Sequence, residues 1–213
     1  MAYAALELRE DVLDRWQDPQ SARSNRYFDR KFGAEAVKLL PGEFAGSGDG
    51  TMLVTILGSC VAACLFDPDA RVGGMNHFML PGEEASGSGS GRYGIHAMEL
   101  LINRLVGLGA ARPRLRAKLF GGAAVVRSMT QTDVGGSNIE FVERYLRTEG
   151  IPIVASDLGG PWPRRVHFFG ESGRVFVKRL PVVEASRIVR DESQHYQQLA
   201  QKAEESGSVE LFS

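Results

Sequence analysis

The sequence predicts an α/β fold in which helices pack on a mixed, largely antiparallel β-sheet. Short apolar runs separated by turn residues fill the first half of the chain, as expected for strands joined in hairpins. Two later segments repeat apolar residues at the spacing of one helix face, and strand-like runs follow each of them. This combination of hairpins and strand-helix-strand units is typical of a single α/β domain.

The first half of the chain predicts a β-meander. Its strand-like runs are residues 36–40, 51–57, 61–66 and 72–80. Pro41 and Gly42 follow the first run, and the tetrapeptide Asp-Pro-Asp-Ala at residues 67–70 separates the last two. Pro, Gly and Asp favour turns, so these segments are expected to reverse the chain.

The second half predicts two helices and the remaining strands. Residues 94–108 form the first helix, with one apolar face made of Ile95, Met98, Ile102 and Leu105. The second helix is expected to be capped by Ser137 or Asn138, to end at Gly150 and to carry a stripe of Ile139, Val142, Tyr145 and Leu146. Strands are expected at residues 115–120, 151–155, 166–169 and 174–180, the last two joined across residues 171–173.

The length and polarity of the chain predict one domain with polar ends. The chain has 213 residues, of which 43% are hydrophobic, enough to bury one substantial core. We expect a polar N-terminal extension at residues 1–26, the domain proper at 27–182 and a polar helical tail at 183–213.

Composition argues against several functional classes. The 25 basic and 26 acidic residues give a net charge of -1, so no strong field favours nucleic acid or anionic lipid. The longest apolar run, residues 52–66, is too short to cross a bilayer, and the N-terminus lacks the pattern of a secretory signal. The two cysteines, Cys60 and Cys64, form no disulfide framework, which favours a reducing cytoplasm.

The hairpin around residues 67–70 brings a cysteine and a histidine together. If these four residues form the loop, Phe66 pairs with Arg71 and Cys60 lies opposite His77. Opposed side chains in an antiparallel pair have Cβ atoms about 4.5–5.5 Å apart on the same face of the sheet. The sequence therefore predicts a thiol close to an imidazole.

A paired thiol and imidazole indicate acyl-transfer chemistry. The imidazole can generate the thiolate that attacks a carbonyl, and it can then protonate the leaving group. Gly58 and Ser59 lie just before Cys60, where a bend in the backbone would direct amide N–H groups at a developing oxyanion. We take these residues as the candidate site.

Structural interpretations of the same residues stay open. A cysteine in an apolar strand is often a small buried hydrophobe, which we expect of Cys64, and a histidine on a strand is often a packing residue. A zinc site is a weaker alternative, because the other histidines lack the spacing of paired ligands. The segment at residues 82–91 lacks the ending of a phosphate-binding loop and is expected to be a connector beside the site.

Two motifs carry a resemblance to a known family. The segments LGSCVA at residues 57–62 and GGMNHFMLP at residues 73–81 resemble those of the chemoreceptor glutamine deamidase family, CheD. The likeness extends over about residues 27–180 and includes the segments RYG at 92–94, KLFGGA at 118–123, DLGG at 157–160 and RRV at 164–166, and Gly135 with Asn138.

The resemblance implies a fold and an activity. The family fold is a compact α/β sandwich, similar in its active centre to bacterial toxin deamidases. The implied activity is the cofactor-independent conversion of chemoreceptor glutamines to glutamates, with Cys60 as the nucleophile and His77 as the acid/base. The implied partners are cytoplasmic receptor domains and a CheC-type phosphatase. Asn76, Arg92 and Tyr93 are candidates for the substrate groove.

One position departs from the family pattern. The resemblance implies a catalytic threonine six positions before the cysteine, but that position is Val54, and Thr55 follows it. One step along a strand reverses the direction of a side chain. We therefore expect Thr55 to serve only if a bulge or twist near Gly58 redirects it.

Two other functional classes remain open. The protein can be a non-catalytic adaptor that acts by occupying a receptor or a phosphatase. It can also be a cysteine hydrolase for another bond, such as a receptor methyl ester.

Overall fold

The computed structural model describes residues 25–80, 89–124 and 133–181, together with residues 190, 192 and 194. Side chains are described from residue 93 onward in the segment that begins at residue 89. Residues 1–24 of the predicted N-terminal extension and most of the predicted C-terminal tail lie outside the described residues, as do residues 82–88 of the predicted connector.

The described strands form two five-stranded sheets. The first sheet contains, in spatial order, β1 (Arg26–Asp29), β2 (Ala34–Lys38), β4 (Met52–Leu57), β9 (Arg164–Phe169) and β10 (Arg174–Arg179). The second contains β3 (Phe44–Ser47), β6 (Val72–Asn76), β5 (Val61–Asp67), β7 (Arg116–Gly121) and β8 (Ile153–Leu158). The described helices are α3 (Gly89–Gly107), α4 (Val134–Thr148) and the short 3-10 helix η2 (Arg112–Arg114).

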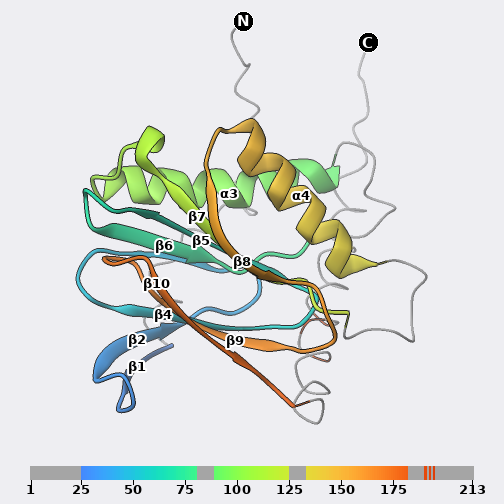
Figure 1. Ribbon diagram of the computed structural model, residues 1–213, viewed down its shortest axis with the longest axis horizontal. Helices are drawn as coiled ribbons and strands as arrows, with labels where there is room; N and C mark the ends of the chain where they lie inside the picture. The colour runs from blue at the N-terminus through green and yellow to red at the C-terminus, as the bar shows by residue number, and fades with distance from the viewer. Residues whose placement is uncertain are drawn as a thin grey trace, which may run out of the picture.

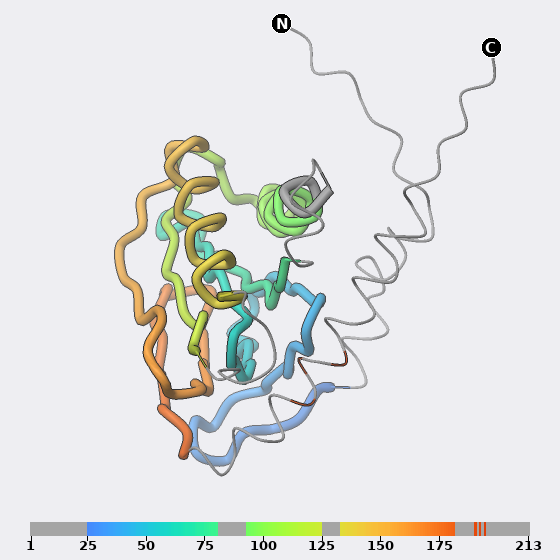
Figure 2. The backbone as a smooth tube through the Cα atoms, turned by 90° about the vertical axis from the view of Figure 1, so that its right-hand side faces the viewer, coloured from blue at the N-terminus to red at the C-terminus, as the bar shows by residue number. Residues whose placement is uncertain are grey.

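These elements form three layers, with α3 and α4 on one face of the second sheet and the first sheet on its other face (Figure 1, Figure 2). Strand β5 shows why the layers hold together, because every residue in it is buried. Val61, Ala63 and Leu65 belong to the core shared with the helices, whereas Ala62 and Cys64 belong to the core shared with the first sheet. A strand covered on both faces needs apolar residues at every position.

The predicted α/β class is confirmed, as is the largely antiparallel pairing. Only the pairs β2–β4 and β7–β8 are parallel among the described strand pairs. The strands divide between two sheets, however, where we expected one. The chain passes between the sheets at several connections, and Gly58 and Ser59 form the one that leads from β4 in the first sheet to β5 in the second.

The helices begin earlier than expected. Helix α3 starts at Gly89, before the predicted residue 94, and α4 starts at Val134 with Asp133 as its N-cap. The Asp133 side chain accepts a hydrogen bond from the backbone N–H of Gly136, so the expected cap at Ser137 or Asn138 is wrong. Glycine is unfavourable within a helix, but Gly135 in the first turn of α4 allows a close approach to the backbone of Gly122. A Cβ at Gly135 would lie 2.7 Å from the carbonyl oxygen of Gly122.

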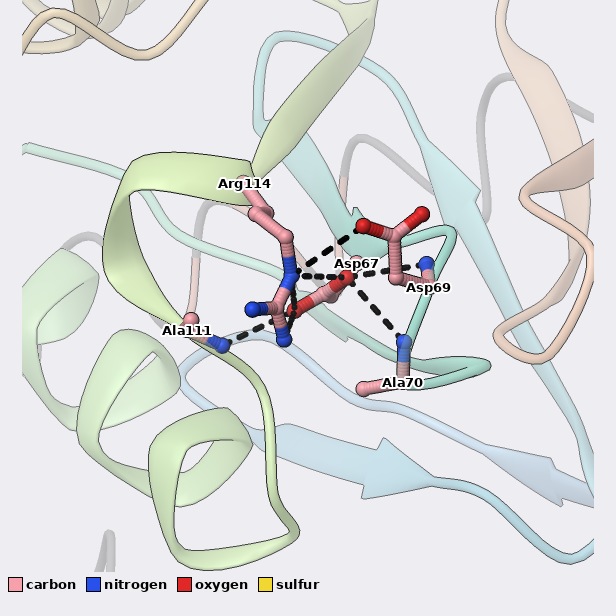
Figure 3. Close-up of polar contacts among 5 residues, drawn as sticks. All are labelled: Asp67, Asp69, Ala70, Ala111 and Arg114. Carbon is pink, nitrogen blue, oxygen red and sulfur yellow. Dashed lines mark hydrogen bonds and ion pairs between the residues drawn. The ribbon is translucent and has the colours of Figure 1, made fainter.

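The hairpin loop differs by one position on each side from its prediction. Asp67 pairs with Val72, so the loop is residues 68–71, with Arg71 at a positive φ of 55°. The buried Asp67 carboxylate accepts hydrogen bonds from the N–H groups of Asp69 and Ala70, and Arg114 binds it from the other side (Figure 3). These bonds hold Asp67 at the end of the strand, whereas the prediction placed it in the loop.

Candidate active site

Three buried side chains meet at one end of the interface between the sheets. Thr55 comes from β4 in the first sheet, Cys60 precedes β5 in the second sheet, and His77 follows β6. Thr55 and Cys60 have no exposed surface and His77 is 1% exposed. The candidate site is therefore assembled across the two sheets.

Cys60 and His77 lie close together, although the strand register differs from the one that we predicted. We expected the two residues to be directly opposite, but Val61 forms a bridge with Phe78, in line with the pairing of Asp67 with Val72. The true register is shifted by two residues, so Cys60 lies diagonally from His77. A shift of two keeps both side chains on the same face, and diagonal neighbours remain within reach of long side chains. A ring nitrogen of His77 lies within 4.8 Å of the Cys60 sulfur.

Thr55 binds the imidazole directly. Its Oγ1 lies 2.8 Å from Nδ1 of His77 and 2.9 Å from the carbonyl oxygen of Leu39. A carbonyl can only accept, so the single hydroxyl proton of Thr55 points to Leu39 and Nδ1 of His77 carries the proton that Thr55 accepts. This arrangement makes Nε2 the basic nitrogen of the neutral ring.

Thr55 reaches this position from a regular strand. Strand β4 pairs with β9 without interruption from Met52 to Leu57, so the bulge or twist that we expected is wrong. Leu53 and Leu57 lie in the core between the sheets, and Thr55 shares their face by strand alternation. Val54, at the position of the family threonine, lies in the opposite cluster with Ala36 and Met52.

A carboxylate from the C-terminal segment lies against the turn before Cys60. Oε1 of Glu192 accepts hydrogen bonds from the backbone N–H of Gly58 at 2.7 Å and of Cys60 at 3.3 Å. Oε2 accepts from the N–H and the hydroxyl of Ser59, both at 2.8 Å. The backbone of residues 58–60 therefore presents the N–H groups of Gly58 and Cys60 to one carboxylate oxygen and that of Ser59 to the other. Paired N–H donors on one anionic oxygen are the arrangement of oxyanion sites.

Backbone hydrogen bonds from the residues that follow β7 hold this turn in place. Gly122 donates its N–H to the carbonyl oxygen of Cys60, and Ala123 donates to that of Gly58, both at 2.7 Å. Gly121 has a φ of 110°, and an added Cβ there would overlap the carbonyl oxygen of Cys60. A residue with a side chain is therefore excluded at Gly121 by both conformation and space.

Two buried polar side chains complete the support. Nδ2 of Asn138 donates to the carbonyl oxygen of Ser59 at 3.0 Å, and Oδ1 accepts from the N–H of Leu80 at 2.8 Å. Arg164, 3% exposed, donates to the carbonyl oxygen of Gly121 at 3.0 Å and forms an ion pair with Asp157. Helix α4 and strand β9 thereby fix the position of the turn.

Burial and charge make the Cys60 thiol resistant to ionisation in this arrangement. Burial raises the pKa of Cys60 well above its ordinary value, and the charge and hydrogen bond of Glu192 raise it further. Burial also raises the pKa of Cys64, which lies in the core between the sheets as expected. Only Cys60 has a histidine and a carboxylate beside it among the described residues.

The other predicted groove residues are not all at this site. Asn76 is fully buried on the helix side of the second sheet, where it accepts from the N–H of Ala63 and donates to the carbonyl oxygen of Ala97. Those contacts explain Asn76 as a structural link between β5 and α3. Tyr93 packs beside the helix-side core, and the side chain of Arg92 lies outside the described residues.

The described residues contain one group of three side chains with the donor types of a metal site. It consists of Cys60, His77 and Glu192, whose donor atoms all lie within 4.8 Å of one another. The Glu192 oxygens already accept four hydrogen bonds from residues 58–60, three of them from backbone N–H groups. That directed set of donors fits an acyl-transfer site, in which a carbonyl or carboxylate oxygen occupies the place of the Glu192 oxygens.

Comparison with known proteins identifies the family. Residues 79–179 match the family model described as CheD chemotactic sensory transduction. A protein of Dechloromonas aromatica named "Probable chemoreceptor glutamine deamidase CheD 1" is 50% identical over 89% of this chain and 94% of its own. The chain belongs to the CheD family. Its relative of the same name from Shewanella oneidensis is 47% identical over 88% of this chain and 93% of its own.

A third relative and one solved structure extend the comparison. A protein of Laribacter hongkongensis named "Probable chemoreceptor glutamine deamidase CheD" is 43% identical over 92% of this chain and 97% of its own. The crystal structure of Bacillus licheniformis hypothetical protein YfiH aligns with 54% of this chain and 49% of its own at a TM-score of 0.36 and 14% identity, too low to define a common fold. No helix in the described part of the chain is long and apolar enough to span a membrane.

Sequence reasoning missed the residues that support the site from distant segments. Glu192 is 133 residues from Ser59, and nothing in the polar C-terminal sequence distinguishes it from neighbouring glutamates. Asn138 and Arg164 lie in segments that resemble the family motifs, which was the available signal for them. Their contacts with the turn at residues 58–60 and with Gly121 depend on tertiary packing.

Proposed function

We propose that this protein is a protein-glutamine deamidase that acts on chemoreceptors, with Cys60 as the nucleophile, His77 as the acid/base and Thr55 as the group that orients His77. The names of its relatives support the substrate and the reaction. The observation that carries the mechanism is the hydrogen bond between Thr55 and His77, with a ring nitrogen of His77 within 4.8 Å of the Cys60 sulfur and the backbone N–H groups of residues 58–60 beside them.

In the first half of the reaction, the neutral His77 accepts the thiol proton through Nε2. The Cys60 sulfur then bonds to the side-chain carbonyl carbon of a receptor glutamine. The N–H groups of Gly58 and Cys60, which already point at one common oxygen of Glu192, donate to the resulting oxyanion.

In the second half, the protonated His77 donates its proton to the departing nitrogen, the carbon–nitrogen bond breaks, and ammonia leaves a thioester on Cys60. A water molecule then loses a proton to His77 and attacks the thioester carbon. The carbon–sulfur bond breaks, and His77 returns the proton to the sulfur to restore the thiol. The net reaction consumes the carboxamide and one water and yields glutamate and ammonium.

Every step of this mechanism uses a residue of this chain or a water molecule. The proposed substrate is a glutamine side chain on a protein surface. The proposed substrate is the cytoplasmic region of a receptor, so we place the reaction in the cytoplasm. Because these regions are helical bundles, the glutamine is expected to be exposed on a helix. The family resemblance also implies a CheC-type phosphatase as a partner.

The test is mass mapping of a receptor cytoplasmic fragment after incubation with the protein. Deamidation adds about 1 Da per site and releases ammonia, loss of a methyl ester removes about 14 Da, and an adaptor changes no mass. We expect the gain of mass with the natural protein and with Cys64→Ala, and none with Cys60→Ala. Full activity in folded Cys60→Ala would refute the assignment of the nucleophile.

A further inference from the structure

The Glu192 carboxylate occupies the place that the proposed mechanism gives to the reacting group. It accepts from the backbone N–H groups of residues 58–60, including those of Gly58 and Cys60 that would stabilise the oxyanion. It also lies within 4.8 Å of both the Cys60 sulfur and a ring nitrogen of His77. A receptor glutamine cannot use these donors while Glu192 does.

The chemistry of this contact is specific. The product of glutamine deamidation is a glutamate side chain, and Glu192 presents that same side chain to the site from within the chain. The buried position of Glu192, at 2% exposure, argues against a chance surface contact. Burial of a carboxylate is costly unless hydrogen bonds compensate it, and the backbone turn before Cys60 supplies them.

We propose that Glu192 is an intramolecular product mimic, which inhibits the enzyme by competing with receptor glutamines for the N–H groups of residues 58–60. This inference rests on the proposed deamidase function. The raised pKa of the Cys60 thiol agrees with it, because Glu192 contributes to holding the nucleophile in its unreactive form. A receptor glutamine must displace Glu192 before the thiolate can attack.

Competition from within the chain predicts a kinetic signature. A tethered competitor acts at an effective concentration on the order of millimolar, so it raises the apparent KM for the receptor without changing kcat at saturation. Glu192→Ala should therefore lower KM about tenfold or more and leave kcat nearly unchanged. Gln194→Ala is the matched control, because Gln194 is an exposed residue two positions further along the same segment.

A second variant turns the inhibitor into a substrate. In Glu192→Gln, the Cys60 sulfur would bond to the new carboxamide carbon, ammonia would leave with a proton from His77, and water would replace the sulfur. The products are a carboxylate at position 192, ammonium and the restored thiol. We therefore expect the purified Glu192→Gln protein to gain about 1 Da at position 192, and Glu192→Gln combined with Cys60→Ala to keep the carboxamide.

A measurement on the free protein keeps this inference separate from the proposed function. The rate of Cys60 alkylation by iodoacetamide, mapped by mass spectrometry, needs no receptor. We expect Glu192→Ala to accelerate it about tenfold or more relative to the natural protein, and Gln194→Ala to leave it unchanged. Equal rates in the natural protein and Glu192→Ala would overturn the inference.

The combined outcomes distinguish the two failures. Receptor deamidation with no change of KM in Glu192→Ala, or with a stable carboxamide in Glu192→Gln, overturns the product mimic and leaves the deamidase function standing. Absence of receptor deamidation in both the natural protein and Glu192→Ala refutes the proposed function, and the product mimic falls with it. Activity that appears only in Glu192→Ala supports both.

Discussion

Oγ1 of Thr55 lies 2.8 Å from Nδ1 of His77, and this hydrogen bond joins the two sheets at the candidate active site. The Thr55 hydroxyl donates its hydrogen bond to the carbonyl oxygen of Leu39, so it accepts the hydrogen bond from the N–H of Nδ1. The contact therefore orients the imidazole and leaves Nε2 as the ring nitrogen without a proton when His77 is neutral. In the proposed mechanism, this neutral side chain would have the orienting role that a carboxylate has in many catalytic triads.

The first prediction concerns this contact. Thr55→Val keeps the shape of the side chain but removes the hydroxyl, so the ring of His77 loses its orienting partner. We expect kcat for receptor deamidation to fall about 10- to 100-fold, the cost of misplacing a catalytic group by about 1 Å. Thr55→Ser restores the hydroxyl and should recover most of the activity. Equal activity in the Val and Ser variants would show that the hydroxyl does not orient His77.

The second prediction concerns Gly121 beneath the Cys60 turn. Gly121→Ala places a Cβ on the carbonyl oxygen of Cys60, whereas Gly109→Ala meets no atom within 4 Å. The two glycines have similar φ angles of 110° and 101°, so both variants carry a conformational cost of about 1–3 kcal/mol. Gly121→Ala should lose about 1–3 kcal/mol more in denaturant unfolding, because of the overlap. Equal losses would mean that the turn moves freely.

The third prediction concerns the buried carboxylate shown in Figure 3. Burial alone would raise the pKa of Asp67, but hydrogen bonds from Arg114 and from the N–H groups of Ala111, Ala70 and Asp69 outweigh it and hold the pKa well below its usual range. Because the pKa is lower in the folded state, the ionised Asp67 contributes stability that is fully present above the unfolded pKa of about 3.9. This contribution is lost as the pH falls from that value through the lower pKa of the folded state. Urea unfolding between pH 7 and pH 2 should show this loss.

Asp67→Asn should remove that acid-sensitive contribution and destabilise the protein by about 2–3 kcal/mol at pH 7, since hydrogen bonds to a charged group are lost. Asp69→Asn is the matched control, because the Asp69 side chain is 73% exposed and approaches Arg114 only at 3.5 Å. A similar loss in both variants would contradict the role of the buried carboxylate.

The fourth prediction concerns the pH dependence of the thiol. Burial raises the pKa of Cys60, and Glu192 adds to the effect. Only the thiolate is alkylated, so in Cys64→Ala the rate of Cys60 alkylation should still rise at pH values where the denatured protein, with a thiol pKa of about 8.5, has levelled off. Stopped-flow alkylation from pH 6 to 10 measures both curves. A folded-state midpoint below the denatured one would reverse this electrostatic account.

The sequence by itself determined the parts of this protein that depend on local patterning. Strand alternation and turn residues predicted an α/β chain and placed Cys60 and His77 on one face of a hairpin. The prediction survived a register error, because Asp67 stayed in the strand and Arg71 entered the loop, which shifts the pairing by two residues and preserves the face.

Only the tertiary structure decided what surrounds the pair. Thr55 faces His77 because β4 lies in a separate sheet that packs against the second, and the sequence could not show that the chain crosses between sheets at Gly58. Glu192 reaches the same turn from a distant segment. Such contacts depend on how layers pack, and packing joins residues that no local periodicity or turn signal relates to one another.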